Sequence, residues 1–177
     1  ENMLDYKLAF KTNIIPTSYN FWINTKGNLV VAGYYTTDID NWRIENSDYV
    51  FDQKNYGSFY FNLDTKTSKV KSSSFDPFGK EILSLDWNKK DVEKMQEKIK
   101  AGETGKVGFD YLGIHIAELQ DDGSFYIIGQ RSFKVMKGNE LSSYPEHYSQ
   151  GIMLVQYDSS GKAAAKTFIN KRQYSFN

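Results

Sequence analysis

Two polar stretches of the sequence combine carboxylate and aromatic side chains, which together can bind a ligand through hydrogen bonds and ring contacts. The first stretch runs from Thr36 to Tyr56 and the second from Arg131 to Tyr148. The first stretch shows no helical period and is predicted to be a long loop, and the second is predicted to be a polar loop from Lys137 to Gln150; binding residues collect in such loops on rigid scaffolds. The ligand-binding residues expected in them are Asp38, Asp40, Trp42, Asp48, Tyr49, Tyr144 and Tyr148.

Catalysis and metal binding are less well supported. A glycosidase needs two carboxyl groups roughly 5 to 10 Å apart, but Asp64, Asp121/Asp122 and Asp158 lie in predicted hairpin turns, where Asp bonds its own backbone. The two histidines, His115 and His147, have no partner at a metal-ligand spacing. No nucleophile elbow, phosphate loop or dinucleotide fingerprint is present. We therefore expect no catalytic residue, no metal and no cofactor.

The composition excludes several classes of protein. The chain has 177 residues, with 22 Lys plus Arg against 22 Asp plus Glu, so its formal net charge is zero and no nucleic-acid partner is expected. It has no cysteine, which excludes disulfides and thiolate chemistry. No apolar run approaches the roughly 20 residues of a membrane-spanning helix, so no membrane span is expected. The chain begins at Glu1 without a methionine, and we expect it to be a piece of a longer protein.

Most of the chain has the pattern of antiparallel strands. Aromatic residues make up 16% of it, and together with Thr, Val and Ile they favour a pleated, half-buried surface. Short turns containing Gly, Asn or Asp join the runs into hairpins. The predicted strands are 4–11, 19–23, 29–35, 58–63, 69–75, 111–119, 124–135, 152–157 and 163–170.

One segment breaks this pattern. Asn88 to Ala101 is rich in helix formers, contains no Gly or Pro, and is followed by Gly102 at a C-terminal cap position. Val92, Met95 and Ile99 form a single narrow apolar stripe. We predict a surface helix that buries this stripe, exposes Lys90, Lys94 and Lys98, and can be deleted without unfolding the sheets.

The two halves of the chain repeat each other. Gly27 and Gly33 match Gly123 and Gly129 at an offset of 96 residues, and the run from Gly57 to Asp64 matches Gly151 to Asp158 at an offset of 94. Each copy holds four strands in two hairpins, with the helix between the copies.

The repeat predicts an all-β fold of two four-stranded antiparallel units, resembling β-propeller blades, with one inserted surface helix. The expected boundaries are an outer strand of a preceding unit at 1–11, a first unit at 12–87, the helix at 88–102 and a second unit at 103–177. A two-sheet sandwich of about nine strands fits the same pattern and stays open as an alternative.

A resemblance to a known family rests on four runs: Asp121 to Gln130, Tyr148 to Gly161, Ile169 to Gln173 and the helix. They resemble uncharacterised secreted β-propeller-like proteins of Bacteroidetes, which carry a Lys/Glu-rich helix, a "DDGG…LIGE" turn and strand, a "NDIIVV-ID-G" strand and a "KRQ" ending. The sequence departs from that pattern at Gly151-Ile152, where the family usually has Asn-Asp, and at Gln130, where it often has Glu. The resemblance implies a propeller-like fold and an extracytoplasmic location, in the periplasm or at the cell surface.

These observations together predict a non-catalytic scaffold or binding module of the bacterial cell envelope. Its partner is expected to be a protein or a glycan, and open blade faces are expected to promote self-association. The alternative is a fragment of a glycan-processing propeller enzyme, which would show a carboxyl group of raised pKa near a second acid.

Overall fold

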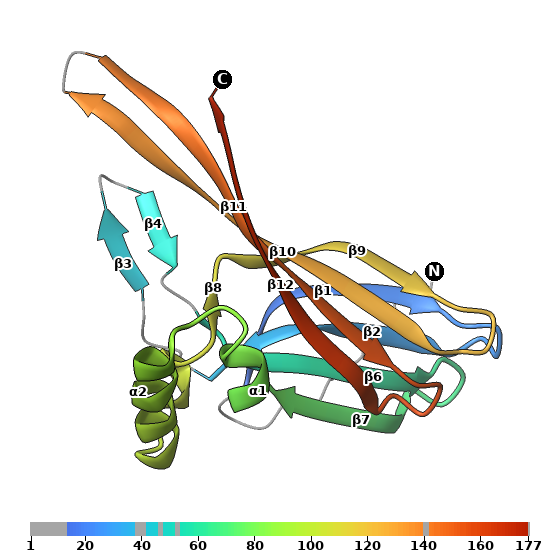
Figure 1. Ribbon diagram of the computed structural model, residues 1–177. Helices are drawn as coiled ribbons and strands as arrows, with labels where there is room; N and C mark the ends of the chain where they lie inside the picture. The colour runs from blue at the N-terminus through green and yellow to red at the C-terminus, as the bar shows by residue number, and fades with distance from the viewer. Residues whose placement is uncertain (1–13, 38–41, 46–47, 52–53, 140–141, 177) are drawn as a thin grey trace.

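The computed structural model describes residues 14–37, 42–45, 48–51, 54–139 and 142–176, and most of them lie in antiparallel strands. Two four-stranded sheets dominate the fold (Figure 1). The first has the order β1 (Ile15–Ile23), β2 (Leu29–Thr36), β6 (Gly57–Asp64), β7 (Lys69–Pro77). The second has the order β9 (Leu112–Leu119), β10 (Phe125–Asn139), β11 (Ser142–Tyr157), β12 (Ala163–Phe176). The predicted all-β class is therefore confirmed.

The remaining elements connect or extend the sheets. They are the hairpin β3 (Trp42–Glu45) and β4 (Asp48–Phe51), the short pair β5 (Lys54–Asn55) and β8 (Phe109–Asp110), the helices α1 (Lys80–Leu83) and α2 (Lys89–Lys100), and the 3-10 turn η1 (Thr104–Lys106). The strand predicted at 4–11 lies outside the described residues.

Both predicted long loops contain strands, which corrects the sequence analysis. The stretch from Thr36 to Tyr56 holds β3, β4 and β5, and the stretch from Arg131 to Tyr148 is the continuation of β10 into β11. Their aromatic and β-branched residues favour strands. Strand pairing across each hairpin supplied the order that their polar composition did not indicate.

The two sheets repeat the same pairing register. Gly33 of β2 lies opposite Phe59 of β6, and Gly129 of β10 lies opposite Met153 of β11. At the end of the same strands Tyr35 faces Gly57, as Arg131 faces Gly151. The glycines matched in the sequence thus occupy equivalent places in equivalent strands, as predicted.

Equivalent residues nevertheless point in different directions with respect to the core. We call face A the side of each sheet that carries Val31 and Phe59 or their equivalents Ile127 and Met153. Face B is the opposite side, which carries Ala32 and Tyr60 or their equivalents Ile128 and Leu154. The main core contains Ala32 and Tyr60 from the first sheet but Ile127 and Met153 from the second. Face B of the first sheet therefore packs on face A of the second, in a head-to-tail arrangement.

Two tyrosines and two glycines interlock the sheets. A Cβ added at Gly129 would lie 2.4 Å from the Oη atom of Tyr34, and one added at Gly161 would lie 1.9 Å from a ring carbon of Tyr60. Tyr60 also stacks on Phe125 with ring centroids 5.2 Å apart. The glycines therefore leave the space that the rings of the opposite sheet occupy.

The helix α2 docks as predicted through one stripe. Val92 and Met95 are buried and Ile99 packs partly against the core, whereas Lys90, Lys94 and Lys98 are exposed. The N-terminus is capped by Asn88, whose side chain accepts a hydrogen bond from the backbone N–H of Asp91. Because this stripe joins the same core as both sheets, we no longer expect deletion of the helix to leave the sheets intact.

Truncation of the buried methionine tests this helix contact. Met95→Ala should lower the free energy of unfolding by about 2–3 kcal/mol, because it removes buried methylene groups and leaves a cavity. Lys94→Ala, one position away on the exposed side, should change it by less than about 0.5 kcal/mol. Urea unfolding followed by circular dichroism measures both, and equal effects of the two substitutions would contradict the docking.

Candidate functional site

The predicted ligand-binding residues lie on two hairpins that leave the sheets at equivalent points. Trp42 lies on β3, Asp48 and Tyr49 lie on β4, and Tyr144 and Tyr148 lie on β11. Asp38 and Asp40 lie outside the described residues. Each hairpin is inserted between the second and third strands of its sheet, and both project from the end of the sheets that is opposite the short hairpin turns (Figure 1).

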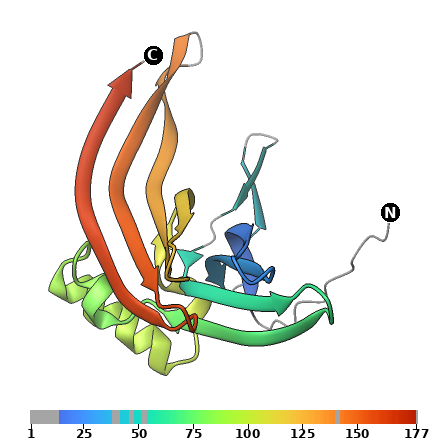
Figure 2. The same cartoon turned by 90° about the vertical axis from the view of Figure 1, so that its right-hand side faces the viewer.

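The second hairpin forms an arm, which we define as residues 132–139 and 142–150. It extends β10 and β11 beyond the first sheet (Figure 2). The pairing shifts by one residue at Gln150, after which Phe133 faces Tyr148 and Lys137 faces Tyr144. Since β10 continues without a bulge of its own, Phe133 lies on the same side as Ile127 and Arg131. The arm thus prolongs face A of the second sheet past the point where the first sheet covers it.

Aromatic side chains follow one another along this prolonged face. Phe133 and Tyr148 stack with ring centroids 5.1 Å apart and planes inclined by 4°. Tyr111 meets Phe133 at 5.2 Å, and Tyr144 lies on the same side of β11 as Tyr148. Tyr111 is 41% exposed and Tyr144 is 46% exposed. We call these four residues the aromatic row; it presents stacking surfaces to solvent, as binding surfaces for sugars and apolar groups do.

A polar contact orients the middle of the aromatic row. The hydroxyl group of Tyr148 donates a hydrogen bond to the carboxylate of Glu146, two residues along the same strand. The ring of Tyr148 is therefore held both by its stack on Phe133 and by this bond. A ligand stacking on such a surface meets rings that are already ordered, which lowers the entropic cost of binding.

A buried ionic cluster lies at the base of the arm. Arg131 is 7% exposed; its guanidinium group donates to the Asp86 carboxylate at 2.7 Å, to the Asp110 carboxylate, and to the backbone carbonyl of Asp110 at 3.2 Å. It also lies over the Trp87 ring, 5.4 Å from the centroid. The sequence analysis did not predict this cluster. One signal was available: the chain has only three arginines, and Arg131 takes the strand position that Tyr35 has in the first unit.

Burial and the neighbouring charges shift the pKa of one carboxyl group in this cluster. Desolvation raises the pKa of Asp86, the positive charge of Arg131 opposes that rise, and the negative charge of Asp110 adds to it. The other Asp86 oxygen accepts from the Asn170 side chain at 3.3 Å. Because both carboxylates are bonded to Arg131, the cluster holds the turn between α1 and α2 and the strand β8 against the second sheet.

The aspartates of the hairpin turns bond their own backbones, as predicted. Asp64 accepts from the N–H groups of Lys66 and Thr67, Asp122 accepts from Ser124, and Asp158 accepts from Ser160 and Lys162. The hydrogen bond from the Lys71 side chain lowers the pKa of Asp64 most, and the two backbone hydrogen bonds lower it further, to about 2. These carboxylates stabilise the turns in which they lie.

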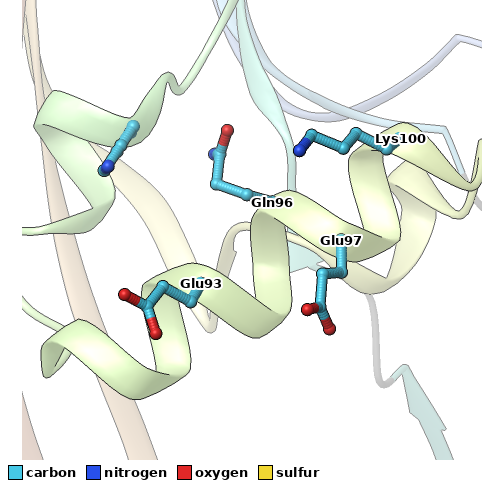
Figure 3. Close-up of a pocket in the computed structure, with 5 residues that line it drawn as sticks. Glu93, Gln96, Glu97 and Lys100 are labelled. Atoms are coloured by element: carbon cyan, nitrogen blue, oxygen red, sulfur yellow. The ribbon is translucent and has the colours of Figure 1, made fainter.

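Two surface cavities lie away from the predicted residues. One, of about 300 Å³, runs along α2 beside Glu93, Gln96, Glu97 and Lys100 (Figure 3). The other, of about 330 Å³, lies between the hairpin turns of the two sheets and is lined by Asn24, Asn62, Lys71, Asp121 and Ser159 among others. The aromatic row borders neither of them.

Comparison with known proteins gives no relative from which to transfer a role. The chain matches no protein-family model, and neither the curated proteins nor the solved structures contain a match. Within the part of the chain that the structure describes, no helix has the length and apolar character needed to cross a membrane.

Proposed function

We propose that the chain is a segment of a propeller-like repeat scaffold and serves as a non-catalytic binding module. The scaffold part is supported by the head-to-tail packing of the two sheets, in which face B of one unit meets face A of the next. Repeat architectures pack in this way because each unit buries its apolar face on its neighbour. A sandwich would need no such correspondence between the faces.

The observation that carries the binding role is the aromatic row on the arm. Its rings lie on the same side of the sheet as the buried residues of face A, yet two of them are more than 40% exposed. The resemblance to secreted Bacteroidetes proteins supports a location in the cell envelope. Exposed rings beside a carboxylate that can accept hydrogen bonds favour a glycan as the ligand, because sugars stack on rings and donate hydroxyl hydrogen bonds. Self-association through open faces stays a prediction.

Oligosaccharide binding tests the proposed ligand class. Calorimetric titration of the chain with soluble hexasaccharides of β-1,4-linked glucose, xylose or mannose should give saturable binding to at least one of them. Tyr144→Ala should weaken that binding about 5- to 10-fold, since it removes one stacking ring. Phe21→Ala, at an exposed ring of β1 on the other sheet, should leave the affinity unchanged. Absence of binding, or an equal loss in both variants, would count against the module.

The alternative, a glycan-processing enzyme, is favoured by one observation. Asp86 has a raised pKa and shares Arg131 with a second acid, Asp110. We rank it second because the guanidinium group bonds both carboxylates. The same hexasaccharides distinguish the two functions: the binding module should release no shorter products, whereas release that disappears in Asp86→Asn would establish the enzyme.

A further inference from the structure

Face B of the second sheet carries an apolar surface. The second sheet covers face B of the first sheet, but no described element covers face B of the second sheet in the same way. Three rows of paired residues cross this face: Glu118–Tyr126–Gln156–Ala165, Ile116–Ile128–Leu154–Thr167 and Gly113–Gln130–Ile152–Ile169. Within these rows the single charged side chain is Glu118, which accepts a hydrogen bond from the Tyr126 hydroxyl. Ile116 is 45% exposed and Ile169 is 54% exposed.

The corresponding face of the first sheet shows what covers a surface of this kind. Ala32, Tyr34 and Tyr60 are the equivalents of Ile128, Gln130 and Leu154, and all three are buried under face A of the second sheet. The exposed isoleucines at the edges of the second sheet correspond by pairing to Asn20 of β1 and Asp76 of β7. The second unit is therefore more apolar at the edges of this face than the first, although it is less covered.

We propose that this face is the docking surface for a third four-stranded antiparallel unit of the same repeat, which packs on it through its own face A. The inference rests on the scaffold part of the proposed function and is independent of the ligand. It continues the interface between the two sheets by one further step of the same head-to-tail arrangement.

The residues of the face also define the chemistry of that partner. In the first interface the large rings of Tyr34 and Tyr60 require glycine at 129 and 161. In the second unit the equivalents of Tyr34 and Tyr60 are Gln130 and Leu154, whose side chains are smaller than that of tyrosine. A docked third unit must therefore carry side chains, at least alanine, where the second unit has glycine, because an empty space in the interface would lose packing contacts.

An extended chain tests the proposal. The full chain is followed by a copy of residues 78–177, so that the helical insert again joins one unit to the next. Leu154→Lys is then made in the middle unit of the extended chain and in the original chain. If the third unit docks, the substitution buries a charge only in the extended chain, and it should lower the urea midpoint there by about 1 M or more. In the original chain the shift should stay below about 0.3 M.

A second substitution tests the predicted chemistry of the partner. Gly129→Ala in the appended copy should raise the urea midpoint of the extended chain, because the copy faces Gln130 and no tyrosine. The same substitution in the original unit, which faces Tyr34, should lower it. Light scattering on the original chain provides the control for other occupants of the face.

Three outcomes would overturn the proposal. The first is an equal effect of Leu154→Lys in both proteins, and the second is separate unfolding of the appended copy. The third is a stable dimer of the original chain that Leu154→Lys dissociates and that persists in the extended chain, since the face would then bind a second copy even when a third unit is present. Loss of oligosaccharide binding would affect only the proposed ligand and would leave these unfolding results unchanged.

Discussion

Gly129→Ala should lower the free energy of unfolding by about 2–4 kcal/mol, which is a large effect for one methyl group added to a packed core. The new Cβ would lie 2.4 Å from the Tyr34 Oη atom and 2.7 Å from a ring carbon. Tyr34 is fully buried between the sheets and has no space to retreat. Urea unfolding monitored by tryptophan fluorescence measures the loss, and an increase in stability would show that the sheets do not interlock.

A control and a rescue make this prediction specific. Gly113→Ala, in the neighbouring strand β9, meets no atom of the described residues within 4 Å and should change stability by less than about 0.5 kcal/mol. Tyr34→Phe removes the nearest of the clashing atoms but leaves the ring carbons at 2.7 and 2.9 Å. Among the residues that the structure describes, the buried Tyr34 hydroxyl has no hydrogen-bond partner, so Tyr34→Phe alone should stabilise the protein by about 1 kcal/mol. Combined with Gly129→Ala it should recover part of the loss, which a double-mutant cycle measures as coupling.

Arg131→Met should destabilise the protein by about 3–5 kcal/mol, because it leaves two carboxylates at the base of the arm without their shared cation. Asp86 and Asp110 both bond the guanidinium group, and Asp86 is largely buried. The triple variant with Asp86→Asn and Asp110→Asn removes the charges as well and should recover most of the stability. If Arg131→Met alone were neutral, the cluster would contribute nothing to holding α1 and β8 on the second sheet.

The pH dependence of this variant has a defined sign. Burial raises the pKa of Asp86 in the folded protein above its unfolded value, and Arg131 opposes that rise. A carboxyl group with a raised folded pKa favours the folded state when protonated, so its contribution is lost as pH increases through the folded pKa. Removing Arg131 raises that pKa further. The loss caused by Arg131→Met should therefore be smaller at pH 4–5 than at pH 8, and this pH dependence should become weaker when Asp86→Asn is added.

Local features of the sequence determined most of the secondary structure. The Asp- and Gly-containing turns at Asp64, Gly123 and Asp158 act within a few residues of the chain, and so do the cap at Asn88 and the alternation of the strands. The repeat was also readable, because Gly33 and Gly129 recur in equivalent strands. Such signals need no knowledge of distant contacts.

Only the tertiary structure decided how the units meet and where the candidate site lies. Apolar residues lie on both faces of each sheet, so alternation alone could not show that Tyr34 packs against Gly129 of the next unit. The arm was predicted to be a loop because of its polar composition, whereas its order comes from pairing across its own hairpin and with the end of β12. The Arg131 cluster joins three segments that are far apart in the sequence. Which side chains become buried depends here on contacts between segments that are distant in the sequence, and such contacts leave no periodic pattern in the residues. For this reason the sequence indicated the strands but not which face of each sheet packs against the other sheet.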